Sequence, residues 1–495
     1  MSSQTLREAR RYEEATEKLL ETELRPDFHL AARVGWLNDP NGFSWYQGKY
    51  HLFYQYYPYA PYWGPMHWGH AVSEDLLHWE YLPAALAPDS PYDRDGCFSG
   101  SAVELEDGKH LLIYTGVLDV PLPEGGKRTI QTQCLATGDG LDYQKYDRNP
   151  VLDEKDIPEG ASKADFRDPK IWRKKNGTFA CIVSSRPADG SGQILLYESE
   201  DGFSWKFKKI LIENRNRYGK MWECPDFFEL DGKQVLLVSP MDMFPKGFEY
   251  HNGNGTLCLI GDYDEETDTF TEQYDQAIDY GIDFYASQTL LTPDGRRVMI
   301  GWIQNWDTVN FLHQDIKWYG QMSIPRELSV KNGRLYQRPV RELEKLRKEK
   351  KEYHDVEIRD TTITLPEIEG RTLDLELKIR CEDPDMLYQK FAVRFAQDDT
   401  FHTAVSFRPH EGIVKIDRKF SGSTRAIIHQ RRCKVEDSEN GELKLRLILD
   451  RCSVEVFIND GIQVMTATLY TDLKAQGISF FADGAVKMDL IQYVI

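Results

Sequence analysis

Five segments of this chain begin with a glycine and continue as an apolar run: GKYHLFYQ (48–55), GKHLLIYTG (108–116), GTFACIVSS (177–185), GKQVLLVSP (232–240) and GRRVMIGWI (295–303). Successive glycines are 60, 69, 55 and 63 residues apart. Each unit consists of an apolar strand, a turn glycine and a second apolar strand, and one small antiparallel sheet cannot bury its faces without neighbours. The sequence therefore predicts an all-β chain that begins with a five-bladed β-propeller.

A second position recurs in step with these glycines. Counting nine residues back from each one gives Asp39, Ser99, Asp168, Glu223 and Ala286. Equivalent residues of successive blades occupy equivalent radii, so side chains at the start of the innermost strands converge on the propeller axis. We therefore expect three acids from three different blades to face one another.

An aspartate that precedes an aromatic residue marks a further register. DLLHW from Asp75, DGLDY from Asp139, DGFSW from Asp201 and DEETDTF from Asp264 recur every 62 to 64 residues. Aspartate and Asp-Gly pairs favour tight turns, so each segment predicts the entrance to an outer strand. Because two registers agree, chance repetition of glycine in a β-rich chain is the weaker explanation.

The length of 495 residues exceeds one ordinary core and predicts more than one domain. We expect a helical extension over residues 1–27, the propeller catalytic domain over 28–338, a linker helix over 339–354 and a C-terminal β-sandwich over 355–495. The sandwich is predicted from alternating strands and from the Asn459-Asp460-Gly461 turn, which lies between two apolar arms.

Charge and composition exclude several classes of protein. The formal net charge of −19 disfavours binding to nucleic acid. No stretch approaches the roughly 20 apolar residues of a membrane span, and the charged N-terminus lacks the apolar core of a signal peptide. The eight cysteines show no CxxC pair, which fits reduced and mostly buried thiols. We expect a cytoplasmic protein with no nucleic-acid or membrane partner.

Each of the three acids lies in a rigid local motif. Asp39 precedes a proline and a tight turn in NDPNG, and Asp168 lies in FRDPK beside Arg167. Glu223 lies in WECPD, where Trp222 is expected to form an apolar wall suited to a general acid. An ordinary Asx turn at Asp39 and a surface ion pair at Asp168 are the alternative explanations.

Three converging carboxylates suit either a cation or acid/base chemistry on a sugar. Aromatic residues favour the sugar, because sugar rings stack on exposed aromatic faces. We expect Trp68 and Trp302 to pack in the core, and Trp63 and Trp306 to contact substrate. A zinc site at His67 and His70 is disfavoured because no third ligand follows at a suitable spacing, and Cys224 has no nearby histidine that would make it a nucleophile.

The motifs GWLNDPNG, FYQ, WGH, FSGSA, FRDP, ECPD, YASQ and PRELS resemble, in order and approximate spacing, those of glycoside hydrolase family 32. This family comprises the β-fructofuranosidases, among them invertases, sucrose-6-phosphate hydrolases, inulinases and levanases. The resemblance covers the five predicted blades and extends to LDRCSVEVFINDG (449–461) near the C-terminus. No catalytic position departs from the family pattern.

The resemblance implies a retaining β-fructofuranosidase that needs no metal and no cofactor. It implies that Asp39 is the nucleophile, that Glu223 is the general acid/base and that Asp168 stabilises the transition state. The substrate-binding residues implied by the family are Asn38, Gln55, Trp63, Phe98, Ser99, Arg167, Tyr285 and Trp306. One carboxylate would capture the anomeric carbon while the other protonates the leaving oxygen and later activates water.

Two other functions stay open at this point. In a fructosyltransferase a second sugar attacks in place of water, and a non-catalytic propeller would only bind carbohydrate. The substrate is a small sugar: sucrose, sucrose-6-phosphate or a short fructo-oligosaccharide. A phosphorylated substrate requires basic groups at the pocket rim, for which the candidates are Arg33, Lys246, His313 and Lys317. Neither the oligomeric state nor the role of the sandwich follows from the sequence.

Overall fold

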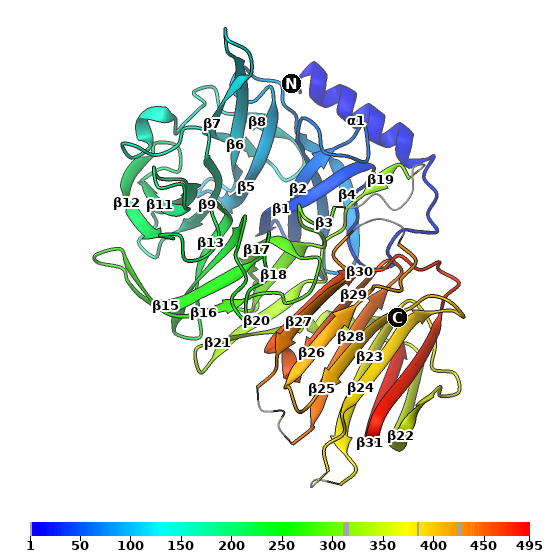
Figure 1. Ribbon diagram of the computed structural model, residues 1–495. Coiled ribbons are helices and arrows are strands. Elements are labelled where there is room, and N and C mark those ends of the chain that lie inside the picture. Colours follow the sequence, from blue (N-terminus) through cyan, green and yellow to red (C-terminus); the bar gives the residue numbers. More distant parts are fainter. Residues whose placement is uncertain (1, 310–315, 384–385, 424–426, 437, 439) are drawn as a thin grey trace.

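A computed structural model of the chain describes residues 2–309, 316–383, 386–423, 427–436, 438 and 440–495. Figure 1 shows a ring of small sheets, coloured blue to green, and a yellow-to-red sandwich that packs against its lower right side. The prediction of an all-β chain with a five-bladed propeller followed by a sandwich is confirmed.

The five blades follow one another along the chain, and each contributes four antiparallel strands. The first blade contains β1 (Gly35–Tyr46), β2 (Lys49–Tyr57), β3 (His67–Ser73) and β4 (Trp79–Leu86); the second contains β5 (Gly96–Glu104), β6 (His110–Pro121), β7 (Lys127–Gly138) and β8 (Tyr143–Lys145); the third contains β9 (Phe166–Arg173), β10 (Phe179–Ser185), β11 (Gln193–Ser199) and β12 (Lys206–Glu213); the fourth contains β13 (Trp222–Leu230), β14 (Lys233–Pro240), β15 (Leu257–Asp264) and β16 (Thr269–Ala277); the fifth contains β17 (Tyr285–Leu291), β18 (Arg297–Trp302), β20 (Arg326–Lys331) and β21 (Arg334–Pro339).

The first strand of each blade is the innermost one, and these strands close the ring. Strands β1, β5, β9, β13 and β17 contact one another in succession, and β17 returns to β1. A short strand, β19 (Trp318–Tyr319), leaves the fifth blade and pairs in parallel with the start of β1. The last blade is therefore joined to the first by backbone hydrogen bonds.

Aspartate turns lead into four of the outer strands, as the second sequence register predicts. The Oδ1 atom of each aspartate accepts hydrogen bonds from the backbone N–H groups two and three residues further along the chain, just before β4, β8, β12 and β16; these aspartates are Asp75, Asp139, Asp201 and Asp264. Each carboxylate therefore builds an Asx-type turn that fixes where the outer strand begins.

The C-terminal unit has two layers that share one long strand. Strand β31 (Gly477–Val494) pairs with β24 (Lys390–Gln397) through its first half and with β23 (Leu373–Cys381) through its second half. The other strands are β22 (Lys350–Ile363), β25 (Thr403–Arg408), β26 (Ile413–Asp417), β27 (Gln430–Lys434), β28 (Leu443–Asp450), β29 (Ser453–Ile458) and β30 (Gln463–Thr468). The predicted Asn459-Asp460-Gly461 turn, which forms η3, joins β29 to β30 in a hairpin.

The linker differs from the helix expected over residues 339–354. Only Arg341–Leu346 is helical, as the 3₁₀ helix η2, and β22 already begins at Lys350. The expectation was wrong outside Arg341–Leu346. From Lys350 onward the reason is that β22 pairs with β31, and the run of backbone hydrogen bonds outweighs the helical propensity of the charged residues. Another 3₁₀ turn, η1 (Glu154–Asp156), lies between the second and third blades.

Helix α1 (Gln4–Glu17) lies within the N-terminal extension and packs on the first blade (Figure 1). Ser3 caps the helix by accepting a hydrogen bond from the backbone N–H of Leu6. The buried Glu13 carboxylate accepts a hydrogen bond from the backbone N–H of Ala84, just before the end of β4. The described residues contain no helix with the length and apolar character needed to cross a bilayer.

Buried charges join the two domains. The imidazole of His29, from the propeller domain, lies 2.8 Å from Asp450 and 3.0 Å from Glu455, both in the sandwich. Burial opposes protonation of His29, but its hydrogen bonds to the two carboxylates raise its pKa to about 9. Arg326 of β20 binds the same Glu455 at 2.6 Å. Two cations of one domain therefore pair with two carboxylates of the other, so neither carboxylate is left as an unpaired buried charge.

Candidate active site

A β-bulge interrupts the innermost strand of every blade near its beginning. The register between first and second strand shifts after Leu37, Phe98, Arg167, Glu223 and Tyr285. A bulge re-aims the side chains beside it. The five innermost strands therefore present their bulged residues at one end of the central channel, and the predicted acids lie there.

Counting nine residues back from each glycine ends at or beside the bulge, but in the fourth blade it ends one residue earlier than in the third and fifth. The left-handed position of the bulge is Asp168 in β9, Cys224 in β13 and Ala286 in β17, with φ of 64°, 48° and 55°. In the fourth blade the turn glycine follows the end of the first strand by two residues, whereas in the third and fifth blades it follows by four. The strand between bulge and turn is one residue longer in the fourth blade, so the count back from its glycine ends one position early. Glu223 is therefore equivalent to Arg167 and Tyr285.

Asp39 is held by two neutral donors. Ser99 donates a hydrogen bond to its Oδ2 at 2.7 Å, and Asn38 donates to its Oδ1 at 3.0 Å. Burial raises the pKa of Asp39 to about 6; the hydrogen bond from Ser99 opposes this rise, and the nearby charge of Glu223 adds to it. Asp39 is therefore an ionised carboxylate at neutral pH.

Cys224 lies between Asp168 and Asp39. Its Oδ2 accepts a hydrogen bond from the backbone N–H of Cys224 at 2.9 Å, and the Cys224 Sγ lies 3.6 Å from Asp39 and 3.7 Å from Asp168. Burial raises the pKa of Asp168, against the effect of Arg167. Burial and the neighbouring carboxylates also raise the pKa of the Cys224 thiol, so the sulfur stays protonated between the two acids.

Glu223 is surrounded by different groups. Arg167 binds its Oε1 through Nε at 3.1 Å and Nη2 at 3.0 Å, and the Tyr285 hydroxyl lies 2.7 Å from its Oε2. These three residues occupy equivalent positions of successive blades, which explains why they meet. The expected apolar wall of Trp222 is wrong: neighbouring strand residues face opposite sides, and the Trp222 indole is buried, donating to the Tyr218 carbonyl.

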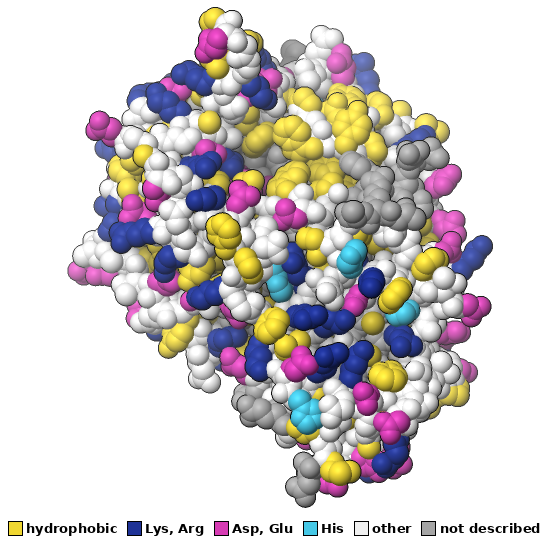
Figure 2. All heavy atoms as spheres, viewed as in Figure 1, with side chains coloured by type: hydrophobic (Ala, Val, Ile, Leu, Met, Phe, Trp, Pro, Cys, Tyr) yellow, Lys and Arg dark blue, Asp and Glu magenta, His cyan; other side chains and the backbone are white. Residues whose placement is uncertain are grey.

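Exposed aromatic residues surround the same end of the channel. Strands β2 and β18 run antiparallel to β1 and β17, so the loops that follow them carry Trp63 and Trp306 to the end where the acids lie. Trp63 is 47% exposed and Trp306 is 37% exposed, whereas Trp68 and Trp302 are fully buried, as expected. Figure 2 shows hydrophobic side chains gathered on the upper part of one face, over the propeller.

The other predicted binding residues lie around Asp39. Phe98 packs edge-on against Trp63, with ring centroids 6.0 Å apart. Asn38 accepts a hydrogen bond from the Trp36 indole, and Gln55, opposite the bulge in β1, donates to the Cys97 carbonyl. All of the predicted site residues therefore lie at one end of the propeller.

Sequence reasoning missed Cys224 as a member of the site. Its proximity to Asp39 and Asp168 depends on the bulge in β13, for which the adjoining proline was the available signal. No group of three or more histidine, cysteine or acidic side chains within the described ranges is arranged to hold a metal ion.

The candidate phosphate-binding residues have different surroundings. Arg33 pairs with Glu13 and Glu17 of α1, so its charge is already neutralised. Lys246 lies over the rings of Tyr218 and Tyr250, in the loop between β14 and β15. Lys317 is exposed, and His313 lies outside the described residues.

Comparison with known proteins gives consistent matches along the whole chain. Residues 29–339 match the glycosyl hydrolases family 32 N-terminal domain, and residues 342–494 match the glycosyl hydrolases family 32 C-terminal model. Raffinose invertase of Escherichia coli is 36% identical over 92% of this chain and 92% of its own length. Sucrose-6-phosphate hydrolase of Bacillus subtilis is 33% identical over 94% of this chain and 93% of its own length.

Solved structures show the same likeness. The Bombyx mori GH32 beta-fructofuranosidase superposes with a TM-score of 0.83 at 34% identity, covering 99% of this chain and 97% of that one. Sucrose-6-phosphate hydrolase from Lactobacillus gasseri gives a TM-score of 0.83 at 29% identity, covering 100% of this chain and 96% of that one.

Proposed function

Because the chain belongs to family 32 of the glycosyl hydrolases, we propose that it hydrolyses terminal β-D-fructofuranosides with retention of configuration. The observation that carries this proposal is the meeting of Asp39, Asp168 and Glu223, from three blades, at the end of the propeller where Trp63 and Trp306 are exposed. Two of these acids have unlike surroundings, as a nucleophile and a proton donor require.

In the first step the Asp39 carboxylate attacks the anomeric carbon of the fructosyl unit. The bond from that carbon to the leaving oxygen breaks, and Glu223 gives this oxygen its proton. In the second step Glu223 takes a proton from water, the water oxygen bonds to the anomeric carbon, and the ester to Asp39 breaks. Asp168, together with Arg167, would hold fructosyl hydroxyls and stabilise the positive charge that develops on the ring.

Tyr285 supports both protonation states of Glu223 in this scheme. Its hydroxyl lies 2.7 Å from Glu223 Oε2 and 3.0 Å from the Ser239 carbonyl oxygen. When Glu223 is ionised, the tyrosine can donate to it. When Glu223 is protonated, the carboxyl can donate to the tyrosine oxygen, while the tyrosine donates to Ser239.

We propose that the substrate is sucrose, sucrose-6-phosphate or a short fructo-oligosaccharide encountered in the cytoplasm. The relatives include both an invertase and a sucrose-6-phosphate hydrolase, which supports this range. A comparison of kcat/KM for sucrose, its 6-phosphate and short inulin-type and levan-type oligomers distinguishes between these substrates.

The mechanism is tested by the Asp39→Ala and Glu223→Ala variants. Both should lose nearly all release of fructose from sucrose while keeping the fold. An aryl fructoside, whose leaving group needs no proton, should restore turnover to the Glu223 variant but not to the Asp39 variant. Full activity of Asp39→Ala would refute the assignment. At high sucrose concentration, formation of oligosaccharides in place of free fructose would identify a fructosyltransferase. Absence of any turnover by the wild type would identify a non-catalytic propeller.

A further inference from the structure

One segment of the fifth blade runs along the sandwich. Residues 278–284 connect β16 to β17, and they follow the edge of β30. The backbone N–H of Tyr280 donates to the Val464 carbonyl at 2.8 Å, and the N–H of Ile282 donates to the Thr466 carbonyl at 2.7 Å. The segment therefore extends the hydrogen bonding of the sandwich, although it belongs to the propeller.

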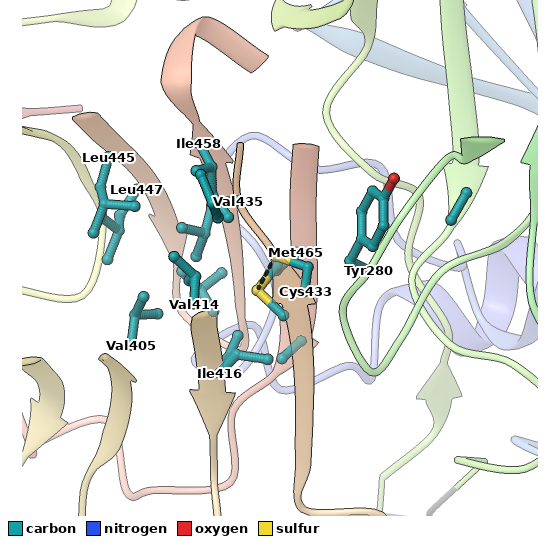
Figure 3. Close-up of a cluster of buried hydrophobic side chains, with 14 of the residues drawn as sticks. Tyr280, Val405, Val414, Ile416, Cys433, Val435, Leu445, Leu447, Ile458 and Met465 are labelled. Carbon is teal, nitrogen blue, oxygen red and sulfur yellow. Dashed lines mark hydrogen bonds between the residues drawn. The ribbon is translucent and has the colours of Figure 1, made fainter. Parts of the chain in front are cut away.

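The approach of this segment to β30 leaves no space between the backbones. A Cβ atom on Gly281 would lie 2.1 Å from the Thr466 nitrogen and 2.3 Å from its oxygen, so no other residue fits there. Tyr280 is fully buried and belongs to the same hydrophobic cluster as Cys433 and Met465 of the sandwich. Figure 3 shows its ring beside these two side chains.

A buried ion pair fixes the end of the segment. Arg418, which follows β26, places Nη1 at 2.5 Å from Asp283 Oδ2, and both side chains are fully buried. The same oxygen accepts hydrogen bonds from the backbone N–H of Thr468 at 2.7 Å and from its hydroxyl at 2.9 Å. Three donors from the sandwich therefore converge on one propeller carboxylate.

This carboxylate lies two residues before Tyr285, the neighbour of Glu223. Rotation or displacement of Asp283 would move the start of β17, and with it the hydroxyl that lies 2.7 Å from Glu223. The Trp306 loop depends on the same segment, because the Asn305 amide donates to the Ile282 carbonyl at 2.9 Å. The sandwich therefore supports one neighbour of the proposed acid and one aromatic residue of the rim.

We infer that Arg418 of the sandwich is a positioning residue for the proton donor Glu223, and that it acts through Asp283 and Tyr285. This inference rests on the proposed function, since it assumes that Glu223 protonates the leaving group. It also assigns a role in turnover to the C-terminal domain, whose described residues form no hydrogen bond or ion pair with Asp39, Asp168 or Glu223.

The test compares Arg418→Met with the wild type on two substrates, sucrose and an aryl β-fructofuranoside. Misplacing the proton donor should lower kcat for sucrose about tenfold or more, because general acid catalysis is worth at least that much. The rate on the aryl substrate should change by less than about threefold, since this leaving group departs without a proton. Equal losses on both substrates would overturn the inference.

A double-mutant cycle separates positioning from general damage. If Arg418 acts through Tyr285, then Arg418→Met should cost little further activity on sucrose in a Tyr285→Phe background. Independent, multiplying losses would contradict the inference. His29→Gln is the matched control, since it removes another buried cation from the same domain interface and should lower both rates by the same factor, if at all.

A milder variant, Thr468→Val, keeps the test decisive if Arg418→Met does not fold. Thr468→Val preserves the side-chain shape but removes the hydroxyl donor to Asp283, and should give a smaller loss with the same preference for the aryl substrate. Unchanged sucrose turnover in Thr468→Val would count against the inference. If Glu223→Ala shows no preference for the aryl substrate, the proposed function itself fails, so the two failures are distinguishable.

Discussion

Replacement of Ser99 by alanine tests how a neighbouring hydroxyl tunes the pKa of Asp39, the proposed nucleophile. The Ser99 hydroxyl donates to Asp39 Oδ2 at 2.7 Å, and this hydrogen bond favours the ionised carboxylate. Burial acts in the opposite direction and sets the pKa of Asp39 at about 6. Without the hydroxyl, ionisation should become harder, so the acid limb of the pH profile of kcat/KM should move to higher pH.

The size of this shift follows from the hydrogen bond. A hydrogen bond to a charged group contributes about 1.5–3 kcal/mol, and about 1.4 kcal/mol corresponds to one pKa unit. We take the low end, because Asp39 is only partly buried and water can replace the hydroxyl. A rise of about one unit from about 6 lowers the ionised fraction at pH 6 about fivefold, but changes it by about a tenth at pH 8.

The assay is the initial rate of fructose release at low sucrose concentration from pH 4.5 to 8.5. Ser101→Ala is the matched control, because Ser101 lies on the same strand and is buried. Its hydroxyl donates to the Pro169 carbonyl, accepts from the Ile171 N–H and has no hydrogen bond to an acid among the described residues. The control should keep the wild-type acid limb. If the acid limb of Ser99→Ala coincided with that of the control, the hydrogen bond would not tune Asp39 and our reasoning would fail.

Three further predictions concern the exposed tryptophans, Asp39 and the domain interface. Trp63→Ala and Trp306→Ala should each raise KM for sucrose severalfold in steady-state kinetics and leave kcat nearly unchanged. A fall in kcat alone would show that these rings do more than stack on the sugar. Burial raises the pKa of Asp39 from 3.8 to about 6, so its ionisation destabilises the fold as the pH rises through that window. Asp39→Asn removes this cost and should increase the free energy of unfolding at pH 7 by up to about 3 kcal/mol, measured by urea titration. His29 has a pKa raised from 6.5 to about 9, so the stability that its protonation gives the fold is complete below pH 6.5 and disappears toward pH 9. The free energy of unfolding of the wild type should fall by about 3 kcal/mol across this range. His29→Gln should be less stable than the wild type at pH 6.5, and its stability should depend less on pH.

The sequence was sufficient to predict the repeat and the direction in which the acids point, for a physical reason. A blade cannot bury its faces alone, so the spacing of turn glycines repeats wherever blades repeat. Residues counted from these glycines fall near the start of the innermost strand in all five blades. Asp39 and Asp168 were therefore found without any knowledge of their contacts. The prediction of exposed Trp63 and buried Trp302 succeeded because one follows a strand in a loop and the other ends a strand.

The limits of the sequence reasoning arise where backbone pairing between distant segments decides the structure. Residues 350–354 favour a helix by composition, yet they form β22 because β31, more than a hundred residues further along, offers a complete edge. Cys224 lies between Asp39 and Asp168 because a bulge turns its backbone to a φ of 48°, and the periodicity of the sequence does not specify this bulge. Arg418 is likewise 135 residues from Asp283, and only the packing of β30 against the fifth blade brings them together. In this chain, repeated local geometry determines which residues gather at the proposed sugar site, whereas non-repeating contacts with the sandwich hold Tyr285 and Trp306 in place. Substitutions that alter turnover without replacing a residue around the three acids should therefore concentrate along β30 and the segment 278–284 that pairs with it.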